Sequence, residues 1–427
     1  MTTSVSMHKG IQPPTSARPT ALDWIKINLF SSWLNTLLTL FSVTLIYVIL
    51  RGALGWAFTE ANWAVIPAKL RLLLVGQYPS AVAGEVDYVW RVSLCLYILA
   101  AIIGLHWGAS GRSGERYITA LALLPVLMAL IPVVYHLAVR PEGHTLGAAF
   151  LLALQILALD LVGLVGWLIG RWRGRRFIRL AAILWILYFP LVIVLVRGFG
   201  ADYREGITPF ASVPTRLWGG LLLSLLLAIV GIVFSFPIGV ALALGRRSKL
   251  VVIRALSVIY IEFIRGVPLI SLLFIGSLML NLFMPSGISF DGVVRAMVVI
   301  TLFSAAYLAE NVRGGLQCIP KGQYEAASAI GLGGFQTMFF IILPQALRAV
   351  IPVMMGQFIG LFKDTSLVAI VGLLDLLGIA GGVIADPNYL GTQREVLLFI
   401  SLFYFAFSYA LSYTSRRIET NLGVGTR

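Results

Sequence analysis

Apolar runs separated by short polar segments dominate the 427-residue chain. A helix needs about 20 apolar residues to cross the hydrocarbon core of a bilayer. Runs of roughly this length predict about ten membrane-spanning helices. We place them near residues 33–50, 92–107, 118–138, 147–170, 178–196, 216–245, 266–285, 293–311, 346–366 and 396–414. The pattern therefore predicts an all-α, polytopic integral membrane protein.

The composition agrees with this prediction and argues against several kinds of site. Hydrophobic residues make up 59% of the chain, charged residues make up 12%, and the mean hydropathy is +0.93. The two cysteines and four histidines do not have the spacing of a metal or redox site. The sequence also lacks the G-x-x-x-x-G-K-[ST] pattern that binds nucleotide phosphates. We expect no metal site, no catalytic residue and no cofactor bound by this chain.

The positive charge predicts how the helices are oriented. The net charge is +14 at pH 7, and the Lys and Arg residues lie mostly in short loops beside apolar runs. With the N-terminus in the cytosol, the cytosolic loops hold about twice as many Lys and Arg residues as the outer loops, in agreement with the positive-inside rule. We therefore expect both termini in the cytosol, lipid headgroups beside the loop arginines, and no nucleic-acid partner.

The chain divides into three parts of different character. Residues 1–30 begin with a polar stretch that is rich in Pro, Ser and Thr and lacks a signal peptide, so we expect a disordered cytosolic tail. Residues 31–200 hold the first half of the predicted spans. They include an outer segment, 51–91, whose apolar residues recur at helical spacing and predict an amphipathic helix on the outer leaflet. Residues 201–427 hold the remaining spans and a cytosolic loop over residues 313–348.

The loop over residues 313–348 is helix-prone and bounded by Gly and Pro. It carries the spacing E-A-A-x3-G-x9-I-x-L-P, formed by Glu325, Ala326, Ala327, Gly331, Ile341, Leu343 and Pro344. The helix dipole favours a carboxylate near a helix start, and small alanines let another protein approach the backbone. Glycine allows one short helix to turn into the next, and proline suits the start of the span that follows. We expect an ordered helix–turn–helix that docks a cytosolic protein.

Charged pairs lie inside or beside the predicted spans, where they are costly unless they face protein or water. Glu262 and Arg265 are three residues apart, and so are Glu310 and Arg313, so each pair can interact across one helical turn. We expect both pairs to be structural clamps that orient the loop over residues 313–348. The alternative is that these residues contact the substrate.

Lys363 and Asp364 lie near the outer end of a predicted span. Because they are adjacent on a helix, their side chains point in different directions and cannot simply neutralise each other. Two roles stay open for them, structural pairing and a place on a translocation pathway. Gln357, one or two helical turns earlier, is a further pathway candidate.

Four more motifs support a family resemblance. They are F-I-R-G-V-P-L at 263–269, A-A-Y-L-A-E-N-V-R-G-G at 305–315, I-P-K-G-Q at 319–323 and K-D-T-S-L at 363–367. Together with the spacing that begins at Glu325, they resemble the permeases of ABC importers, and in particular the polar amino-acid branch. This resemblance covers residues 216–420. Residues 31–200, which we call the added region, more loosely resemble part of the long permease subunits of general L-amino-acid and glutamate/glutamine/aspartate/asparagine importers.

The resemblance implies a type I permease core of about five helices that moves polar L-amino acids across a bacterial inner membrane. The Glu325 loop would couple this core to a dimeric ATPase that uses ATP and Mg²⁺. A second permease subunit, expected to form a heterodimer with this chain, and a periplasmic amino-acid-binding protein would complete the complex. Val267 and Leu272 stand where the family often has Thr and Gln, so this subunit lacks a polar group that could face the pathway. The substrate site can therefore lie on this chain or, if the second permease retains such a group, mainly on the second permease.

Two other classes of function remain as alternatives. An ion-coupled secondary transporter would have charged residues near the membrane centre and interrupted helices at matching positions of two halves. A non-transporting membrane scaffold would explain the docking loop but not Lys363 and Asp364. A neighbouring reading frame with a nucleotide-binding motif would favour the importer over both.

Overall fold

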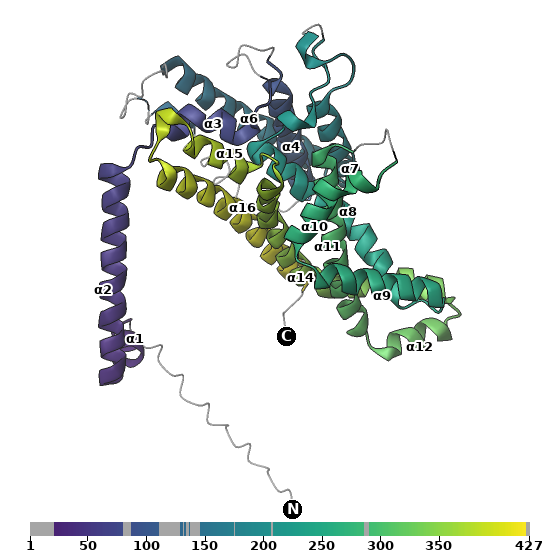
Figure 1. Ribbon diagram of the computed structural model, residues 1–427. Coiled ribbons are helices and arrows are strands. Elements are labelled where there is room, and N and C mark those ends of the chain that lie inside the picture. The colour runs from purple at the N-terminus through teal and green to yellow at the C-terminus, as the bar shows by residue number, and fades with distance from the viewer. Residues whose placement is uncertain are drawn as a thin grey trace, which may run out of the picture. The chain divides into compact units, whose positions relative to one another are not determined.

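The structure is a computed structural model that describes residues 21–79, 87–110, 129–130, 132–133, 136, 146–174, 176–205, 208–285 and 290–423. These residues form helices, which are joined by turns and two isolated β-bridges (Figure 1). The all-α fold class is therefore confirmed. By their contacts the residues form two compact units, which divide after Asn62. The domain boundaries expected near residues 30 and 200 stay predictions.

The first unit consists of two α-helices. α1 spans Ala21–Leu29, in the last part of the predicted tail, and α2 spans Trp33–Gly55. A π-helical turn over Trp56–Glu60 continues α2. The Ser32 hydroxyl accepts a hydrogen bond from the Asn35 amide (3.2 Å) and caps the start of α2. No residue of α2 is buried, which suits a helix whose apolar surface faces lipid. Residues 1–20 lie outside the described residues.

The second unit begins at Trp63 and contains the other helices. Its α-helices are α3 Val65–Val75, α4 Val89–Ala109, α6 Leu146–Arg173, α7 Arg176–Arg197, α8 Gly220–Arg246, α9 Val251–Gly266, α10 Leu269–Phe274, α11 Gly292–Gln317, α12 Lys321–Ala329, α13 Gly334–Gln336, α14 Leu343–Asp364, α15 Leu376–Ile384 and α16 Gln393–Leu422. π-helical turns span Ile275–Met279 (η5) and Thr337–Ile342 (η7), and 3₁₀ turns span Tyr203–Glu205 (η3), Thr215–Leu217 (η4), Leu280–Phe283 (η6), Thr365–Val371 (η8) and Pro387–Tyr389 (η9).

Within the described residues, eight helices are long and apolar enough to cross a membrane, and they match eight of the predicted spans. Most of the span predicted over 118–138 lies outside the described residues. The span predicted over 266–285 begins at a break, because α9 and the helix over Leu269–Met279 meet at an angle of 106° and count as a ninth span only if the bent pair is taken as one. The cause is Pro268, which lacks an amide donor and keeps Val267 out of the helical region.

The added region is held together by a very close approach of α4 to α6. A Cβ atom on Gly104 would lie 2.0 Å from the Gly163 carbonyl oxygen, and one on Gly108 would lie 2.1 Å from the Trp167 carbonyl oxygen. No side chain fits in so short a gap. Small residues at such contacts let membrane helices pack through their backbones, where the hydrophobic effect offers no driving force.

α3 corrects the prediction of an amphipathic helix lying on the outer leaflet. The helix is present, but Val65 and Leu73 are fully buried in a cluster with Leu376 and Ile379 of α15. At its polar side, Lys69 forms an ion pair with Asp386 (2.6 Å). The apolar side of α3 therefore faces protein in place of lipid. Helical periodicity alone cannot distinguish between these two apolar surroundings.

The added region meets the rest of the second unit at a fully buried arginine. Arg91, in the first turn of α4, donates to the Pro209 carbonyl through Nε (3.0 Å) and Nη2 (2.7 Å) and to the Ala211 carbonyl through Nη1 (2.9 Å). Its guanidinium lies 4.2 Å from the centre of the Tyr88 ring. The neighbouring Tyr78 is also fully buried, and burial raises the pKa of its hydroxyl to about 12, although Arg91 opposes this shift. We call these residues the connector junction.

Candidate functional site

α12 ends in a turn that its glycine makes possible. Gly331 has φ = +81°, the left-handed region that favours glycine. The Gly331 amide donates to the Ser328 carbonyl (3.0 Å), and the Leu332 amide donates to the Ala327 carbonyl (3.0 Å). This pair of bonds is a Schellman motif, which satisfies carbonyls at a helix end. The chain then reverses through α13 and η7 into α14.

Polar contacts attach α12 to its neighbours. The Gln345 amide nitrogen donates to the Gln323 side-chain oxygen (3.1 Å) and to the Ile341 carbonyl (2.7 Å). From the end of α8, Arg247 donates to the Tyr324 hydroxyl (3.4 Å). These bonds join α12 to both α8 and α14, so a force applied to α12 reaches two long helices.

The residues of the E-A-A spacing divide between an inner and an outer side. Ala327 and Leu343 are buried, and Ile341 is half-buried against the core. The others are exposed, and they are Glu325, Ala326, Gly331 and Pro344. Within the described part of the chain, no side chain forms an ion pair with Glu325. A carboxylate is thus available on the outer side of α12.

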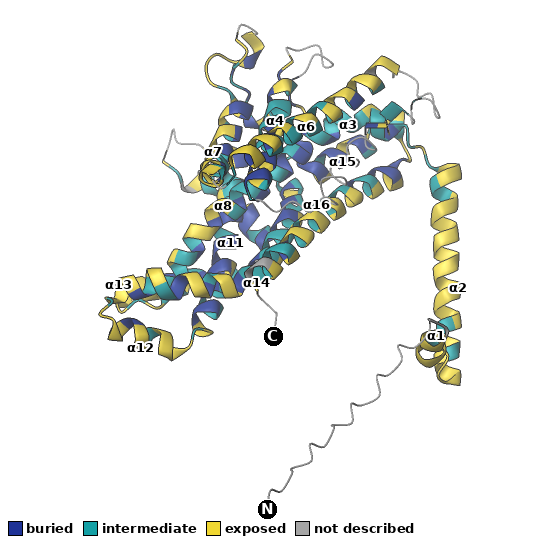
Figure 2. Ribbon diagram, turned by 180° about the vertical axis from the view of Figure 1, so that it is seen from behind, coloured by how far each residue is buried: buried dark blue, intermediate teal, exposed yellow. Residues whose placement is uncertain are grey.

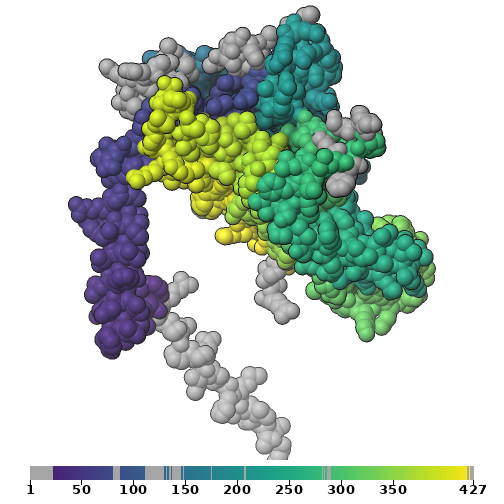
Figure 3. Space-filling view, in the orientation of Figure 1, coloured from purple at the N-terminus to yellow at the C-terminus, as the bar shows by residue number. Residues whose placement is uncertain are grey.

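Large apolar side chains are exposed on the residues that follow this carboxylate. Ile330 is 74% exposed, Phe335 70% and Phe340 67%, and the rings of Phe335 and Phe339 lie 4.4 Å apart. Figure 2 shows the exposed surface along α12 and α13, and Figure 3 shows this green segment at the lower right end of the second unit. Apolar groups grouped on an exposed surface rimmed by polar residues indicate a protein-binding site if that surface faces water, as the charge distribution predicts for this loop. We call residues 325–340 the coupling surface.

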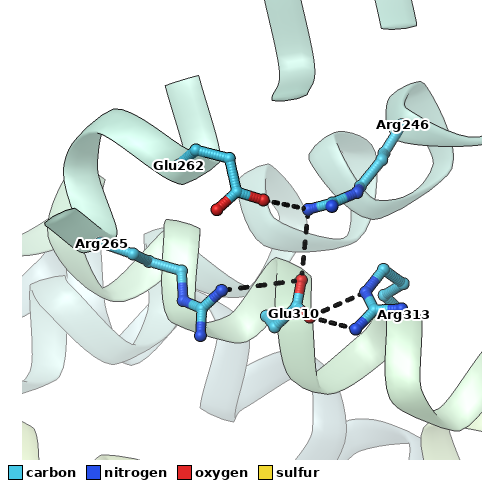
Figure 4. Close-up of polar contacts among 5 residues, drawn as sticks. All are labelled: Arg246, Glu262, Arg265, Glu310 and Arg313. Atoms are coloured by element: carbon cyan, nitrogen blue, oxygen red, sulfur yellow. Dashed lines mark hydrogen bonds and ion pairs between the residues drawn. The ribbon is translucent and has the colours of Figure 1, made fainter. Parts of the chain in front are cut away.

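A network of charged side chains lies at the ends of α8, α9 and α11 (Figure 4). Arg246 of α8 bridges Glu262 of α9 (2.9 Å) and Glu310 of α11 (3.4 Å). Arg265 of α9 approaches Glu310 to 3.9 Å. Arg313 pairs with Glu310 within α11, and its Nε–Oε1 bond measures 2.8 Å. Glu310 is therefore shared by three helices, and we call this group the Glu310 network.

The Glu310 network differs in part from the pairing expected from sequence. Glu310 and Arg313 form the expected pair across one turn. Glu262 and Arg265 do not pair with each other, because their partners lie on other helices, Arg246 for Glu262 and Glu310 for Arg265. Arg246 was missed as a member. Its position in the last turn of a long apolar helix was the available signal, since cations gather there.

Gln357 of α14 faces α11, and both the nitrogen and the oxygen of its side-chain amide form hydrogen bonds there. It donates to the Ser304 carbonyl (2.8 Å) and the Ser304 hydroxyl (3.0 Å), and it accepts from the Asn311 side chain (2.7 Å). These bonds tie α14 to α11. Because the Gln357 amide nitrogen donates two bonds and its oxygen accepts one within the protein, the side chain has little left to offer a passing substrate.

Lys363 and Asp364 end α14 and differ in exposure. Lys363 is exposed and Asp364 is half-buried, and the Lys363 carbonyl accepts a hydrogen bond from the Ser366 hydroxyl (2.8 Å). Among the described residues, neither side chain takes part in an ion pair. Their place on a translocation pathway stays a prediction. The same described residues contain no cluster of three or more His, Cys, Asp or Glu side chains that could hold a metal ion.

Known proteins are similar to this chain over nearly its full length. The family model described as "Binding-protein-dependent transport system inner membrane component" matches residues 235–420. The inner membrane amino-acid ABC transporter permease protein YhdY of Escherichia coli is 37% identical over 99% of this chain and 99% of its own length. The glutamate/glutamine/aspartate/asparagine transport system permease protein BztC of Rhodobacter capsulatus is 35% identical over 96% of both chains. A crystal structure of an amino acid ABC transporter with histidines matches 47% of this chain and 92% of its own chain, with 27% identity and a TM-score of 0.43.

A second family model, described as "Mycoplasma MFS transporter", matches residues 5–172. That class contains secondary transporters, so the match bears on one of the alternatives. The same residues are, however, included in the alignments to YhdY and BztC, which extend over nearly the full length of all three chains. The full-length similarity outweighs a match to fewer than half of the residues.

Proposed function

This chain belongs to the amino-acid ABC transporter permeases, and from that premise we propose that it imports polar L-amino acids under the drive of a separate ATPase that binds α12. It is a multi-pass inner-membrane protein and a non-catalytic subunit of its complex. The observation that supports the coupling role is the coupling surface, where Glu325 lies on the short helix α12 and the exposed Phe335 and Phe340 lie on α13 and η7, which follow it. The cytosolic position of α12 and of both termini rests on the distribution of Lys and Arg.

The coupling surface has the properties of a helix that inserts into a groove. Phe335 and Phe340 offer apolar contact area, and Ala326 lets a partner approach the backbone closely. Glu325 offers a charge that a basic residue of the partner would neutralise. Amphipathic helices that dock in grooves combine such apolar anchors with a few polar contacts. ATP and Mg²⁺ would be bound by the ATPase subunits alone.

The Glu310 network gives α12 a route to the membrane helices. The network joins the ends of α8, α9 and α11, and α11 leads directly into α12. When the ATPase subunits close, they would move α12, and the network would keep these helix ends together during a rigid-body rocking of two permeases. Glu262, Arg265, Glu310 and Arg313 are thus positioning residues in the proposed mechanism.

The complex requires partners besides the ATPase. A second permease, as a heterodimer partner, would close the pathway, and a periplasmic binding protein would deliver the amino acid. The relatives YhdY and BztC, whose names include amino-acid and glutamate/glutamine/aspartate/asparagine transport, support polar L-amino acids as substrates. Lys363 and Asp364 are the pathway candidates on this chain, whereas the bonds of Gln357 favour a structural role.

Charge reversal at Glu325 tests the coupling role. The permease complex would be purified with wild-type sequence or with Glu325→Arg, and both the amount of bound ATPase and ATP-driven uptake of labelled glutamate would be measured. We expect the variant to lose bound ATPase and uptake, because a cation would face the basic residue of the partner. A matched control is Glu205→Arg, an exposed carboxylate elsewhere on the chain. Retention of coupled ATPase by Glu325→Arg would disprove the assignment.

A second pair of variants tests the apolar part of the coupling surface. Phe340→Ser removes a ring that is 67% exposed, and Leu390→Ser removes a similarly exposed side chain (72%) on another segment. We expect only Phe340→Ser to weaken ATPase binding in a pull-down titration. Equal effects of the two variants would show that α13 and η7 are not the site of docking. Uptake that persists without ATP but stops when ion gradients are collapsed would instead favour a secondary transporter.

A further inference from the structure

α9 is too short and too sharply bent to cross a membrane by itself. Its 16 residues extend about 24 Å, whereas the hydrocarbon core of a bilayer is about 30 Å thick. The helix that follows it leaves at an angle of 106°. Figure 1 shows α9 at the same end of the second unit as α12, lying across the ends of the longer helices. α9 is therefore placed to run along a membrane surface.

Two opposite sides of α9 are apolar, but only one of them is covered by protein. Ser257 and Ile261 are buried on the inner side, where Ile261 joins the cluster that contains Leu308 of α11. The outer side exposes a stripe of four large side chains with exposed fractions between 59% and 69%, namely Val252, Leu256, Ile259 and Phe263. Their spacing of four, three and four residues places them in one row along the helix. Figure 3 shows the surface of this segment at the lower right, with no other part of the chain in front of it.

The charges at the start of α9 are all positive. Arg247, Lys249 and Arg254 are exposed, and the sequence has no Asp or Glu from Gly239 to Ile261. Within the described residues, none of the three cations forms an ion pair. An amphipathic helix with cations at its edge and a bulky apolar row is typical of binding to an anionic membrane surface.

We propose that α9 is a membrane-surface helix that binds anionic phospholipid. The row from Val252 to Phe263 enters the acyl-chain region of the leaflet on the α12 side, and Arg247, Lys249 and Arg254 contact the phosphate groups of the lipid. Charge complementarity favours this occupant over a second permease, because three unpaired cations beside an apolar row match a negatively charged lipid surface directly. A protein partner would need a matching group of carboxylates at the same depth.

The lipid contact has a direct connection to the coupling surface. Arg247 donates to the hydroxyl of Tyr324 in α12 (3.4 Å). A guanidinium has five N–H donors, so Arg247 can bind a lipid phosphate and Tyr324 at the same time. Anionic lipid would then hold α12 in its docking position. This consequence rests on the coupling role proposed for α12, whereas lipid binding by α9 does not.

Reconstitution of the whole complex into vesicles tests the proposal. One vesicle preparation contains phosphatidylcholine alone, and the other contains about one-third phosphatidylglycerol. Substrate-stimulated ATPase activity and uptake are measured for the wild type and for the triple variant Arg247→Gln, Lys249→Gln and Arg254→Gln. We expect a several-fold stimulation of the wild type by phosphatidylglycerol and no stimulation of the triple variant. Higher salt should weaken the stimulation of the wild type.

Two control variants separate the α9 site from charge in general. Arg171→Gln, Arg173→Gln and Arg176→Gln together remove the same charge from exposed positions of the added region, and this variant should keep the lipid response. Arg247→Lys with Arg254→Lys retains the charge and should also keep it. The proposal is overturned if the wild type responds equally to both vesicles, if the triple variant keeps its response, or if Leu256→Cys forms a disulfide with the second permease.

The experiment also distinguishes this proposal from the coupling role of α12. The triple variant should retain bound ATPase in detergent, where no bilayer is present, whereas Glu325→Arg should lose it. If Glu325→Arg keeps its ATPase and the wild type still binds phosphatidylglycerol vesicles more tightly than the triple variant does, the coupling role fails and the lipid site stands.

Discussion

Arginine side chains organise two regions of the second unit in opposite ways. In the connector junction, Arg91 is fully buried, bonds to backbone carbonyls and stacks on the Tyr88 ring. No ion pair to Arg91 occurs among the described residues. In the Glu310 network, Arg246, Arg265 and Arg313 share one carboxylate, and the side chains of these four residues are 20–34% exposed.

The difference teaches which region can move. A buried cation that leaves its carbonyls strands both the charge and the acceptors away from water, at a cost of several kcal/mol. Cations that share a partly hydrated carboxylate can exchange partners at little cost, because water and the remaining charges replace each lost contact. The connector junction is thus a fixed attachment of the added region, whereas the Glu310 network can rearrange. The rearrangeable region is the one beside the coupling surface.

The largest expected effect comes from removing the buried arginine. Arg91→Leu leaves the Pro209 and Ala211 carbonyls without donors, so the free energy of unfolding should fall by about 3–5 kcal/mol. Thermal unfolding in detergent and the amount of protein in the membrane would measure the loss. Arg216→Gln, at an exposed arginine of the neighbouring 3₁₀ turn, should change neither. If the two variants unfold at the same temperature, the connector junction is not a fixed attachment.

Removing a buried carboxylate in the same unit should raise the free energy of unfolding at neutral pH, whereas removing Arg91 should lower it. Asp375 is fully buried, caps α15 through the Leu377 and Gly378 amides and accepts from the Tyr404 hydroxyl (3.4 Å). Burial raises the pKa of Asp375 from 3.8 to about 6, although these hydrogen bonds oppose the shift. The raised pKa means that the folded state prefers the protonated acid. Its contribution to stability is therefore complete below about pH 4 and is lost as the pH rises through about 6.

Asp375→Asn should remove this pH dependence. At neutral pH the variant should be more stable than the wild type by on the order of 2–3 kcal/mol, and the difference should shrink as the pH falls toward 4. Unfolding temperatures of both proteins across this pH range would measure it. A difference that stays constant with pH would show that Asp375 does not titrate in the folded protein. At neutral pH, buried Asp375 would lower the stability of the folded protein, whereas Arg91 raises it. Burial alone therefore does not make a charged residue a fixed attachment.

Sequence patterns predicted what depends on neighbours along the chain. The lengths of the apolar runs predicted the helices, and the Gly and Pro spacing predicted the turn at Gly331, because both are local properties. The partners of Glu262 could not be predicted, since an i,i+3 spacing considers one helix and Arg246 lies on another. The sequence placed Arg91 in an outer segment but could not predict its bonds, because its acceptor, the Pro209 carbonyl, is 118 residues away along the chain.

Alanine substitutions at two glycines, one in each region, test the same comparison with smaller expected changes in stability. Gly198, beside the connector junction, has φ = +72°, and a Cβ atom there would lie 2.2 Å from the Ala211 carbonyl oxygen and 2.7 Å from Arg91 Nη1. Gly314 follows Arg313 within α11, and a Cβ atom there would meet nothing within 4 Å. Gly198→Ala should therefore destabilise the protein by about 2 kcal/mol. Gly314→Ala should stabilise it by up to about 1 kcal/mol, because alanine favours the helix.

Chemical denaturation of both glycine variants would measure these changes. A decrease in the free energy of unfolding for Gly198→Ala and an increase for Gly314→Ala would support a rigid connector junction and an open Glu310 network. Destabilisation by Gly314→Ala would instead mean that the end of α11 packs as tightly as the connector junction does, and the contrast between the two regions would disappear.

The smallest effect on stability, yet a clear one on function, is expected for Glu310→Gln. The carboxylate is partly hydrated and the arginines can turn to water or to Glu262, so the free energy of unfolding should change by less than about 1 kcal/mol. The helix ends would lose their shared charge, so more ATP should be hydrolysed for each amino acid imported. This ratio, measured in vesicles, should rise less for Glu262→Gln, because Glu262 is 55% exposed and has one cationic partner. If Glu310→Gln instead lowers the unfolding temperature as far as Arg91→Leu does, the network is a second fixed attachment, and movement of α12 must reach the membrane helices by other contacts, such as those of Tyr324 and Gln345.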